Sequence, residues 1–345
     1  MRTPLRAFLT TLFSVCLLLA SGLTTARADE VTPANAPKPR FITYNVCGAS
    51  KTCDSHNDKA KWLADVTGAI DHWEADVVML QEVCYEQWKL LRTHLAGRAG
   101  TTYDAAWGAA LPSIGNCARW DPDPNDSVAP DLRFGLAILA KGGPGTLDLT
   151  SRTVDFLPEP LEATGTATEN RILLCAKSTV TGRTVRICNT HIDWHAGNKT
   201  AQIAKVAQIT RGFAEAGEPI VLGGDFNQTP KHADMNPLYS HGAGSTGVFQ
   251  EVDENDKDEF RGGDCPQTKD QCRSGENTAS TACSPHTTEN AKIDYIFLSS
   301  SWFTTVRGDA AACSGVADHH LLRGAAAWES QELPPASQEP SARDL

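Results

Sequence analysis

Short runs of β-forming residues that are apolar at successive positions constrain the fold of this chain more than any other feature. Such runs indicate strands covered on both faces, because alternate side chains of a strand point to opposite sides of its sheet. Two other stretches, residues 62–73 and 203–213, repeat an apolar residue every three or four positions and predict amphipathic helices. Strands interleaved with such helices predict a layered α/β or α+β fold. The expected strands are residues 40–46, 76–82, 133–139, 171–179, 184–190, 219–225 and 292–298.

The composition narrows the class of protein. The 345 residues are 41% apolar, which excludes an intrinsically disordered chain, and their number suits one large or two ordinary domains. Asp plus Glu outnumber Lys plus Arg by 42 to 31, so the net charge is −11, which argues against a protein that coats polyanions in general. After residue 28 no stretch is long and apolar enough to span a bilayer, so we expect no stable membrane insertion.

The two ends of the chain differ from its middle. Arg2 and Arg6 precede an uncharged, mostly apolar run to Ala20, and small residues at Ala26 and Ala28 predict cleavage of a signal peptide, residues 1–28. A single membrane anchor is the alternative, although the run is short for a span. We therefore expect a secreted, extracellular protein with a flexible leader at 29–39, one domain at 40–328 and a disordered tail at 329–345. Removal of residues 1–28 takes away three Arg and no acid, which leaves a net charge of −14.

Ten cysteines follow the predicted signal peptide, an even number that suggests disulfides in an exported chain. Residues 171–179 and 184–190 predict two strands joined by a turn at Thr181-Gly182, which would set Cys175 opposite Cys188. Two separate buried thiols are the alternative. A zinc site is less expected, because the sequence has no paired Cys-x-x-Cys spacing. Residues 111–130 and 241–289 predict long loops, the second tied down by the cysteines Cys265, Cys272 and Cys283.

Polar residues close most of the predicted strands. Each alone would be read as a turn former or a helix cap, but six such ends in one chain, each with Asn, Asp, Glu or His, indicate a common site. If the sheets bring them together, four carboxylates share one cleft and need a cation. Oxygen ligands suit Mg²⁺, Mn²⁺ or Ca²⁺, and the set fits phosphoryl chemistry. The residues are Asn45, Glu82, Arg171, His191, Asp225, Asn227, Asp294, Asp318 and His319.

Six segments carry a family resemblance. TYNVC, LQEVC, NTHIDWH, GGDFN, KIDYIF and ADHH occur in this order between Phe41 and Leu322. Together they resemble the endonuclease/exonuclease/phosphatase superfamily, which includes deoxyribonuclease I, apurinic endonucleases, neutral sphingomyelinases and inositol phosphatases. The resemblance implies a four-layer α/β/β/α sandwich with the site at one rim of its two central sheets.

The resemblance also implies a metal site, with Mg²⁺ as the expected ion. Glu82 would be the principal ligand with Asn45 beside it, and Asp225 would act as a metal or water ligand. The fourth ligand of the expected metal site is Asp318.

The remaining roles concern the phosphate and the attacking water. His191 and the amide of Asn227 would contact the scissile phosphate, together with Arg171. His319 would be the general base, oriented by Asp318, and Asp294 would fix His191 or a neighbouring ligand.

Other residues leave alternatives open. Ala317 stands where many members of the family have Ser, and the phosphate-contacting Tyr has only Tyr103 as a candidate, which could equally be a half-buried strand aromatic. Asp193 and His195 could line the cleft or belong to a solvated loop. We expect Trp302 and Phe303 to pack in the core, with membrane contact as the alternative.

Three readings of the substrate compete. A secreted, monomeric nuclease that cleaves DNA or RNA is favoured, although a net charge of −14 is a mild objection because phosphate contacts normally come from clustered Lys and Arg. A sphingomyelinase-like lipid phosphodiesterase or a phosphomonoesterase is the alternative. A non-catalytic binding protein of the same fold is disfavoured, because all the expected site residues are present.

Overall fold

A computed structural model describes most of the chain after the predicted signal peptide. It covers residues 31–53, 55–158, 169–254, 273–284, 286–287 and 290–330. The predicted signal peptide, Cys265, Cys272 and all but the first two residues of the predicted tail lie outside the described residues. Among the helices that are described, none has the length and apolar character needed to cross a membrane.

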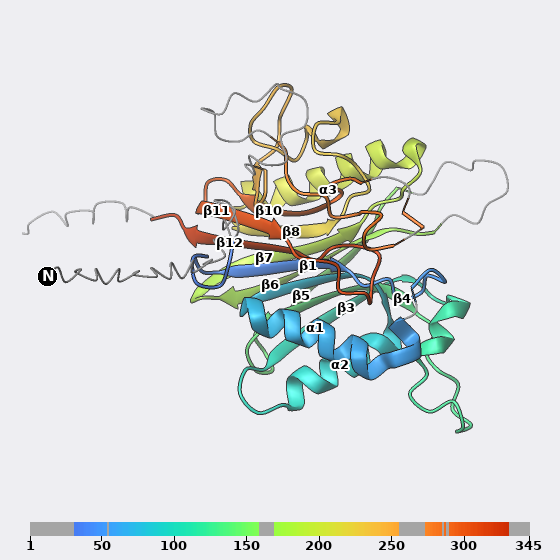
Figure 1. Ribbon diagram of the computed structural model, residues 1–345. Helices are drawn as coiled ribbons and strands as arrows, with labels where there is room; N and C mark the ends of the chain where they lie inside the picture. The colour runs from blue at the N-terminus through green and yellow to red at the C-terminus, as the bar shows by residue number, and fades with distance from the viewer. Residues whose placement is uncertain are drawn as a thin grey trace, which may run out of the picture. The chain divides into compact units, whose positions relative to one another are not determined.

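Two six-stranded mixed sheets lie face to face between helices (Figure 1). The first sheet has the order β11-β12-β1-β2-β4-β3 and the second the order β5-β6-β7-β8-β10-β9. The strands of the first sheet are β1 (Arg40–Asn45), β2 (Val77–Cys84), β3 (Tyr103–Leu111), β4 (Phe134–Lys141), β11 (Phe303–Ala310) and β12 (Leu322–Trp328). Those of the second are β5 (Leu147–Phe156), β6 (Ile172–Val180), β7 (Arg183–His191), β8 (Ile220–Asp225), β9 (Phe249–Glu251) and β10 (Asp294–Ser299).

Helices complete the outer layers. α1 (Lys59–Trp73) and α2 (Tyr85–Gly97) lie on the first sheet and α3 (Ala196–Glu215) on the second (Figure 1). Three apolar clusters separate the four layers, with the middle one between the sheets. The predicted α/β/β/α sandwich is confirmed. Three short 3₁₀ helices interrupt the loops: η1 (Ser55–Asp58), η2 (Gly115–Trp120) and η3 (Ala233–Met235).

All seven predicted strands and both predicted helices are present, but the sequence reading missed five strands and α2. Two of the missed strands, β5 and β11, lie at sheet edges and are largely exposed, so they lack continuous apolar runs. β12 is built from small residues, and β9 has only three residues. α2 begins directly after β2, where the change of period is hard to see.

Two buried amide side chains join the sheets inside the otherwise apolar interface. Gln81 on β2 donates from Nε2 to Asn189 Oδ1 on β7 at 2.7 Å. Asn189 Nδ2 in turn donates to the carbonyl oxygens of Leu80 (2.8 Å) and Ala137 (2.9 Å) in the first sheet. Both side chains are fully buried, where unpaired amide groups would be costly. This contact fixes how the two sheets lie on each other.

The predicted Cys175–Cys188 pair is confirmed as a disulfide between β6 and β7, whose register places the two residues opposite each other. Thr181 and Gly182 form the connecting turn with φ values of 46° and 84°, as a two-residue hairpin requires. Further disulfides join Cys47 to Cys53, Cys84 to Cys117 and Cys283 to Cys313.

The leader and the loop expectations need correction. Val31 is only 3% exposed and packs in the outer core, and Arg40 Nη2 donates to the carbonyl oxygen of Ala36 at 3.2 Å. The packed unit therefore begins at Val31, before the expected boundary at residue 40. The loop at 111–130 contains η2, and the described part of 241–289 contains β9. Phe303 is buried and stacks on Trp328 at 4.4 Å, which confirms core packing there.

A carboxyl pair at the edge of the first sheet couples stability to pH. Glu276 accepts a hydrogen bond from the backbone N–H of Ala310 at 2.5 Å and shares a hydrogen bond with Asp309 on β11. Burial, followed by the hydrogen bond to Asp309, raises the pKa of Glu276 from 4.5 to about 8. The folded state therefore holds this proton more tightly than the unfolded chain. The stabilisation that the bound proton gives to the folded state is complete below pH ~4.5 and is lost as the pH rises through about 8.

We predict that Glu276→Gln flattens this pH dependence, because the amide donates to Asp309 without a proton that can be lost. Between pH 5 and 9, the free energy of unfolding of the wild type should fall by at least ~1.4 kcal/mol more than that of Glu276→Gln. Urea unfolding at both pH values measures this difference. Glu215→Gln, on the exposed side of α3, should behave like the wild type. Equal pH slopes for wild type and Glu276→Gln would contradict the assignment.

Candidate active site

The strand connections place polar side chains from both sheets at one rim. β7 and β8 run parallel, which sets His191 beside Asp225, and β10 runs antiparallel to β8, which sets Asp294 on the other side of Asp225. In the first sheet, β1 and β2 are parallel, so Asn45 ends beside Gln81 and Glu82. The sequence expectation that strand ends converge is correct for these residues.

Two of the site residues have left-handed backbone. Glu82 has φ 56° and lies where the β2–β4 register shifts between Leu80 and Val83, a β-bulge. Its carbonyl oxygen accepts from the N–H of Gly48 at 2.8 Å, which holds the bulge in place. Asn227 has φ 49° directly after β8. Non-glycine residues in this conformation cost energy and cluster at functional sites, where they aim a side chain.

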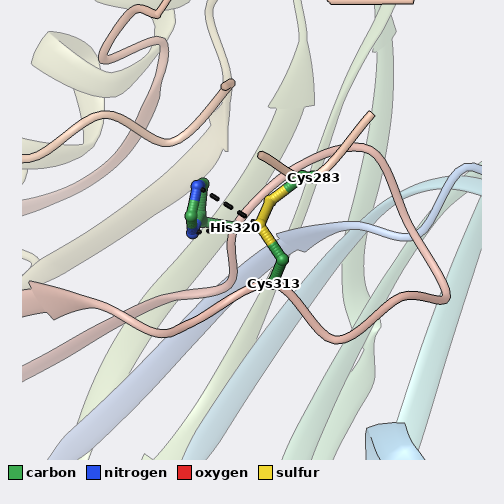
Figure 2. A group of neighbouring side chains, drawn as sticks. All are labelled: Cys283, Cys313 and His320. Carbon is green, nitrogen blue, oxygen red and sulfur yellow. Dashed lines mark hydrogen bonds between the residues drawn. A yellow bond between two sulfur atoms is a disulfide. The ribbon is translucent and has the colours of Figure 1, made fainter. Parts of the chain in front are cut away.

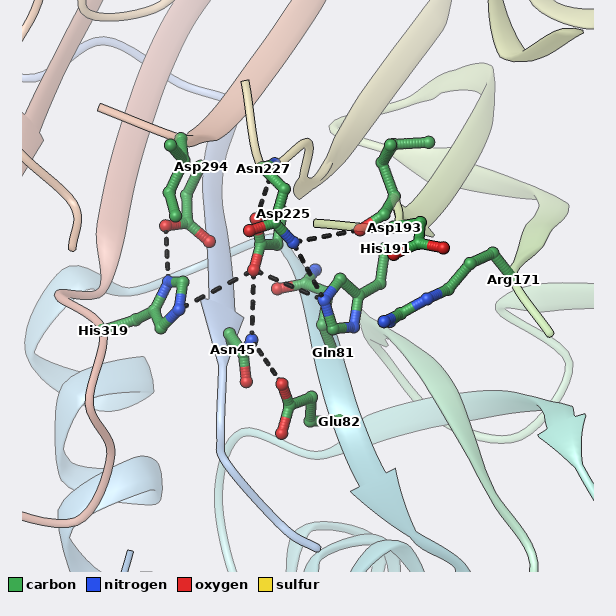
Figure 3. A network of polar contacts seen from close by, with 12 residues as sticks. Asn45, Gln81, Glu82, Arg171, His191, Asp193, Asp225, Asn227, Asp294 and His319 are labelled. Carbon is green, nitrogen blue, oxygen red and sulfur yellow. Dashed lines mark hydrogen bonds and ion pairs between the residues drawn. The ribbon is translucent and has the colours of Figure 1, made fainter. Parts of the chain in front are cut away.

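Asp225 is the centre of the site (Figure 3). Its Oδ2 accepts from Asn45 Nδ2 at 3.2 Å and lies 3.5 Å from His191 Nε2 and 3.7 Å from His319 Nε2. Its Oδ1 accepts from the backbone N–H of Asn227 at 2.9 Å. Asn45 Nδ2 also donates to Glu82 Oε1 at 3.1 Å, so the amide of Asn45 links the carboxylates of the two sheets.

Asp294, rather than Asp318, orients His319. His319 Nδ1 lies 2.8 Å from Asp294 Oδ2, which leaves Nε2 facing Asp225. Burial alone would lower the pKa of His319, but the carboxylates of Asp294 and Asp225 outweigh it and raise that pKa well above the usual range. Of the two partners expected for Asp294, His191 or a neighbouring group, the structure excludes His191, because Asp294 faces His319.

Asp318 points elsewhere. One of its carboxylate oxygens lies within 4.8 Å of the sulfurs of the Cys47–Cys53 disulfide, outside the cluster formed by Asp225, Asp294 and His319. Asp318 lies in a bend directly before His319, and the hydrogen bond to the His319 ring comes from Asp294. Asp318 still acts on Glu82 through its charge.

The carboxylates of the site are poorly balanced without a cation. Burial, with the charge of Asp318, raises the pKa of Glu82 to about 7, and burial with the charge of Asp294 raises the pKa of Asp225. Asp294 Oδ1 is buried and has no hydrogen-bond partner among the described groups. Carboxylate and amide oxygens of this kind fit a hard divalent ion. Glu82 and Asp225 could hold it, with the Asn45 amide between them and Asp318 on the Glu82 side.

Arg171 and His191 form the other side of the site. The Arg171 side chain is 5% exposed, forms an ion pair with Glu169 at 3.2 Å, and lines a small pocket together with His191. Its Nε has no hydrogen-bond partner in the portion of the chain that is described. Burial, then the charges of Arg171 and His319, lowers the pKa of His191 well below its usual value, so this ring is neutral. Sequence reasoning missed Glu169, because nothing distinguishes it from other loop acids.

The positions of Tyr103 and Asp193 decide between the alternatives that the sequence left open for them. Tyr103 lies opposite Lys141, at the far end of β4 from the site, and its hydroxyl donates to the carbonyl of Ala75 at 2.5 Å, so it is no phosphate ligand. Asp193 is buried and accepts from Asn198 Nδ2 at 2.7 Å at the start of α3, so it is structural.

Comparison with known proteins agrees with this geometry. Residues 42–319 match the sequence profile of the Endonuclease/Exonuclease/phosphatase family. The chain belongs to this family. No match was found among curated proteins. Enzymes of the family generally use divalent metal ions and hydrolyse phosphoric esters, and this chain is such a hydrolase.

Solved structures share the endonuclease/exonuclease/phosphatase fold at low identity. The human nocturnin catalytic domain with bound sulfate is 17% identical over 85% of this chain and 94% of its own, with a TM-score of 0.58. A mannosyl-6-phosphatase of Bacteroides thetaiotaomicron is 17% identical over 84% and 100%, with a TM-score of 0.57. A family member from Bacteroides vulgatus is 17% identical over 84% and 98%, with a TM-score of 0.54.

One feature of this family member was not foreseen from its sequence. Thr278 braces the histidine segment: its carbonyl accepts from the N–H of His320 at 2.6 Å, and its Oγ1 accepts from the N–H of Asp294 at 2.9 Å. The Cys283–Cys313 disulfide ties the same segments together beside the His320 ring (Figure 2). This disulfide is partly exposed, whereas the other described disulfides are buried.

We predict that Asp294→Asn lowers kcat by about 10²- to 10⁴-fold, because an amide cannot stabilise the imidazolium of His319. At saturating Mg²⁺, Asp318→Asn should cost less than about tenfold, since Asp294 and not Asp318 is hydrogen-bonded to the His319 ring. Steady-state kinetics on one phosphodiester compares this matched pair. A larger loss in Asp318→Asn would restore the original assignment.

We further predict that mild dithiol treatment reduces Cys283–Cys313 before the buried disulfides and lowers kcat by about 10- to 100-fold. The reason is that shifts of 1 Å in a catalytic group cost up to about 10². Alkylation with mass spectrometry identifies the opened pair while kcat is followed. The double variant Cys283→Ser/Cys313→Ser should show the same loss and no response to reductant. Full activity with this pair alkylated would refute the bracing role.

Proposed function

We propose that this chain is a secreted, Mg²⁺-dependent phosphodiesterase that cleaves nucleic acid by attack of water on phosphorus. The observation that carries the proposal is the arrangement around Asp225. The His319–Asp294 pair stands on one side of it and the neutral His191, with Arg171, on the other. A phosphate bound between these two sides would have a base facing one of its flanks and donors facing the other.

The residues of the chain supply most of the proposed chemistry. In its neutral form the His319 ring can accept a proton from water at Nε2, and the carboxylates of Asp294 and Asp225, which raise the pKa of this ring, stabilise the resulting imidazolium. His191 and Arg171 donate to the phosphate oxygens, where negative charge grows in the transition state. Asn227 Nδ2, held by the carbonyl of Ile192 at 3.0 Å, lies beside His191 as a further donor.

A divalent ion would be held by Glu82, Asn45 and Asp225, with Asp318 on the Glu82 side. When bound, it polarises the phosphate and neutralises negative charge that the site otherwise concentrates. Oxygen donors without cysteine favour Mg²⁺ over a softer ion.

Surface features favour a water-soluble substrate over a lipid. In the described part of the molecule, the exposed large apolar side chains are Val128, Leu149, Phe156 and Trp194. Leu149 and Phe156 lie seven residues apart on β5 and Val128 and Trp194 on two other segments, so the four do not form one continuous stretch of the kind that membrane contact needs. The disulfides suit an extracellular enzyme. A phosphomonoesterase is the second candidate, because the mannosyl-6-phosphatase shares the fold.

The test is a substrate panel for the purified mature protein. It contains plasmid DNA, single-stranded DNA, RNA, sphingomyelin vesicles, bis-nitrophenyl phosphate and nitrophenyl phosphate, each with Mg²⁺ or with a chelator. We expect chelator-sensitive cleavage of nucleic acid and of the diester. Hydrolysis of the monoester or of sphingomyelin alone would overturn the nuclease proposal.

Glu82→Gln tests the ion site. We predict a raised Mg²⁺ concentration for half-maximal activity, because one charged ligand is lost, with recovery of rate at high Mg²⁺. Glu86→Gln, on the neighbouring α2, is the matched control and should keep the wild-type requirement. An unchanged requirement in Glu82→Gln would remove its role as a ligand.

A further inference from the structure

Trp194 is exposed in a way that no other tryptophan of the chain is. Its side chain is 64% exposed, whereas the other seven tryptophans are buried or half-buried. A single exposed aromatic residue is not unusual on a protein surface. Its position and its support are what distinguish this one.

The position of Trp194 is fixed by the reaction centre. Trp194 follows His191 by three residues, so their Cα atoms are at most ~11 Å apart. The intervening Ile192 donates its N–H to the carbonyl of Asp225 at 2.8 Å, and its carbonyl accepts from Asn227 Nδ2. The loop that carries Trp194 therefore leaves directly from the site.

The support of Trp194 is rigid. Its ring lies against the His195 ring, with centroids 3.7 Å apart and the ring planes tilted by 31°. His195 is held by Asp193, whose Oδ1 lies 2.8 Å from His195 Nδ1 and accepts from the His195 N–H at 3.0 Å. Asp193 is itself held by Asn198 and by Gln202, whose Oε1 accepts the Asp193 N–H at 2.9 Å. One face of the indole is thus backed by an imidazole that the start of α3 fixes in place.

We propose that Trp194 is a stacking platform for an unpaired nucleobase, so that the enzyme prefers single-stranded nucleic acid. This rests on the proposed function. A flat ring exposed near phosphate donors suits a nucleotide, because a nucleotide carries a phosphate at one end and a flat base at the other. The chain neighbours of Trp194 are an acid, Asp193, and the partly exposed His195, which argues against insertion of the ring into a membrane. Bases inside a duplex are already stacked and cannot use the platform.

Binding of fluorescein-labelled oligonucleotides tests the proposal in a His319→Ala background, where cleavage is slow. Stacking on an aromatic side chain is worth about 1–3 kcal/mol per base, so Trp194→Ala should weaken single-strand binding by about 5- to 150-fold. Trp194→Phe should recover part of the loss. Leu149→Ala, which removes an exposed apolar side chain at the far end of β5, should bind like its parent.

An abasic oligonucleotide of equal length separates stacking from structure. If Trp194 stacks on a base, the penalty of Trp194→Ala should shrink at least fivefold on the abasic strand. An equal penalty on both strands, or no penalty on either, would overturn the inference. The inference would also be overturned if Trp194→Ala lost binding to lipid vesicles and kept its binding to oligonucleotides. If the wild type hydrolyses bis-nitrophenyl phosphate but no nucleic acid, the nuclease proposal itself fails. If the wild type and Trp194→Ala cleave single strands at the same rate, only the platform is refuted and the nuclease proposal stands.

Discussion

The register between the two sheets is the constraint on which the site depends. Neither sheet holds a complete site: Asn45 and Glu82 belong to the first, and His191, Asp225 and Asp294 to the second. Apolar packing between sheets is non-directional and would tolerate small shifts. The buried contact between Gln81 and Asn189 is directional, and it lies one residue before Glu82 and two before His191. A slip that breaks it would leave amide groups unpaired in the core and separate the two halves of the site.

Within the site, charge is concentrated rather than dispersed. Asp225 shares one oxygen with an amide and two imidazoles, and the neighbouring carboxylates raise each other's affinity for protons. Such a cluster is unfavourable for stability but suits an enzyme that must bind a cation and handle a proton in one place. The two histidines differ because of this setting. His319 faces carboxylates and binds a proton tightly, whereas His191 faces Arg171 and stays neutral.

The sequence predicted the layers and most of the site, and its errors have physical causes. Strands buried on both faces were visible as apolar runs, but the exposed edge strand β5 was not. The strand-end rule located Asn45, Glu82, His191 and Asp225, because parallel strands finish at the same rim. It could not decide between Asp318 and Asp294 as the partner of His319, because that choice depends on which way a loop side chain points. The sequence could not decide between the two roles of Tyr103 for a related reason. A strand has two ends, and the residues do not show which end reaches the rim that carries the site.

The left-handed backbone of Glu82 and the Thr278 brace were beyond sequence reasoning altogether. Both arise from tertiary contacts, the first with Gly48 and the second with the segment around His320. Propensity scales disfavour such a conformation for glutamate, so no local signal announces it.

The pairing of β1 with β12 has a consequence for when the enzyme becomes active. β1 carries the first site residue, and its neighbour in the sheet is the last strand of the fold, which follows His319 directly. A chain emerging from the ribosome, or threaded through a translocation pore, therefore lacks an inner strand of its first sheet until nearly all of it has appeared. The hydrolase site is therefore complete only when nearly all of the described domain has been made, and a growing chain cannot be active before that point.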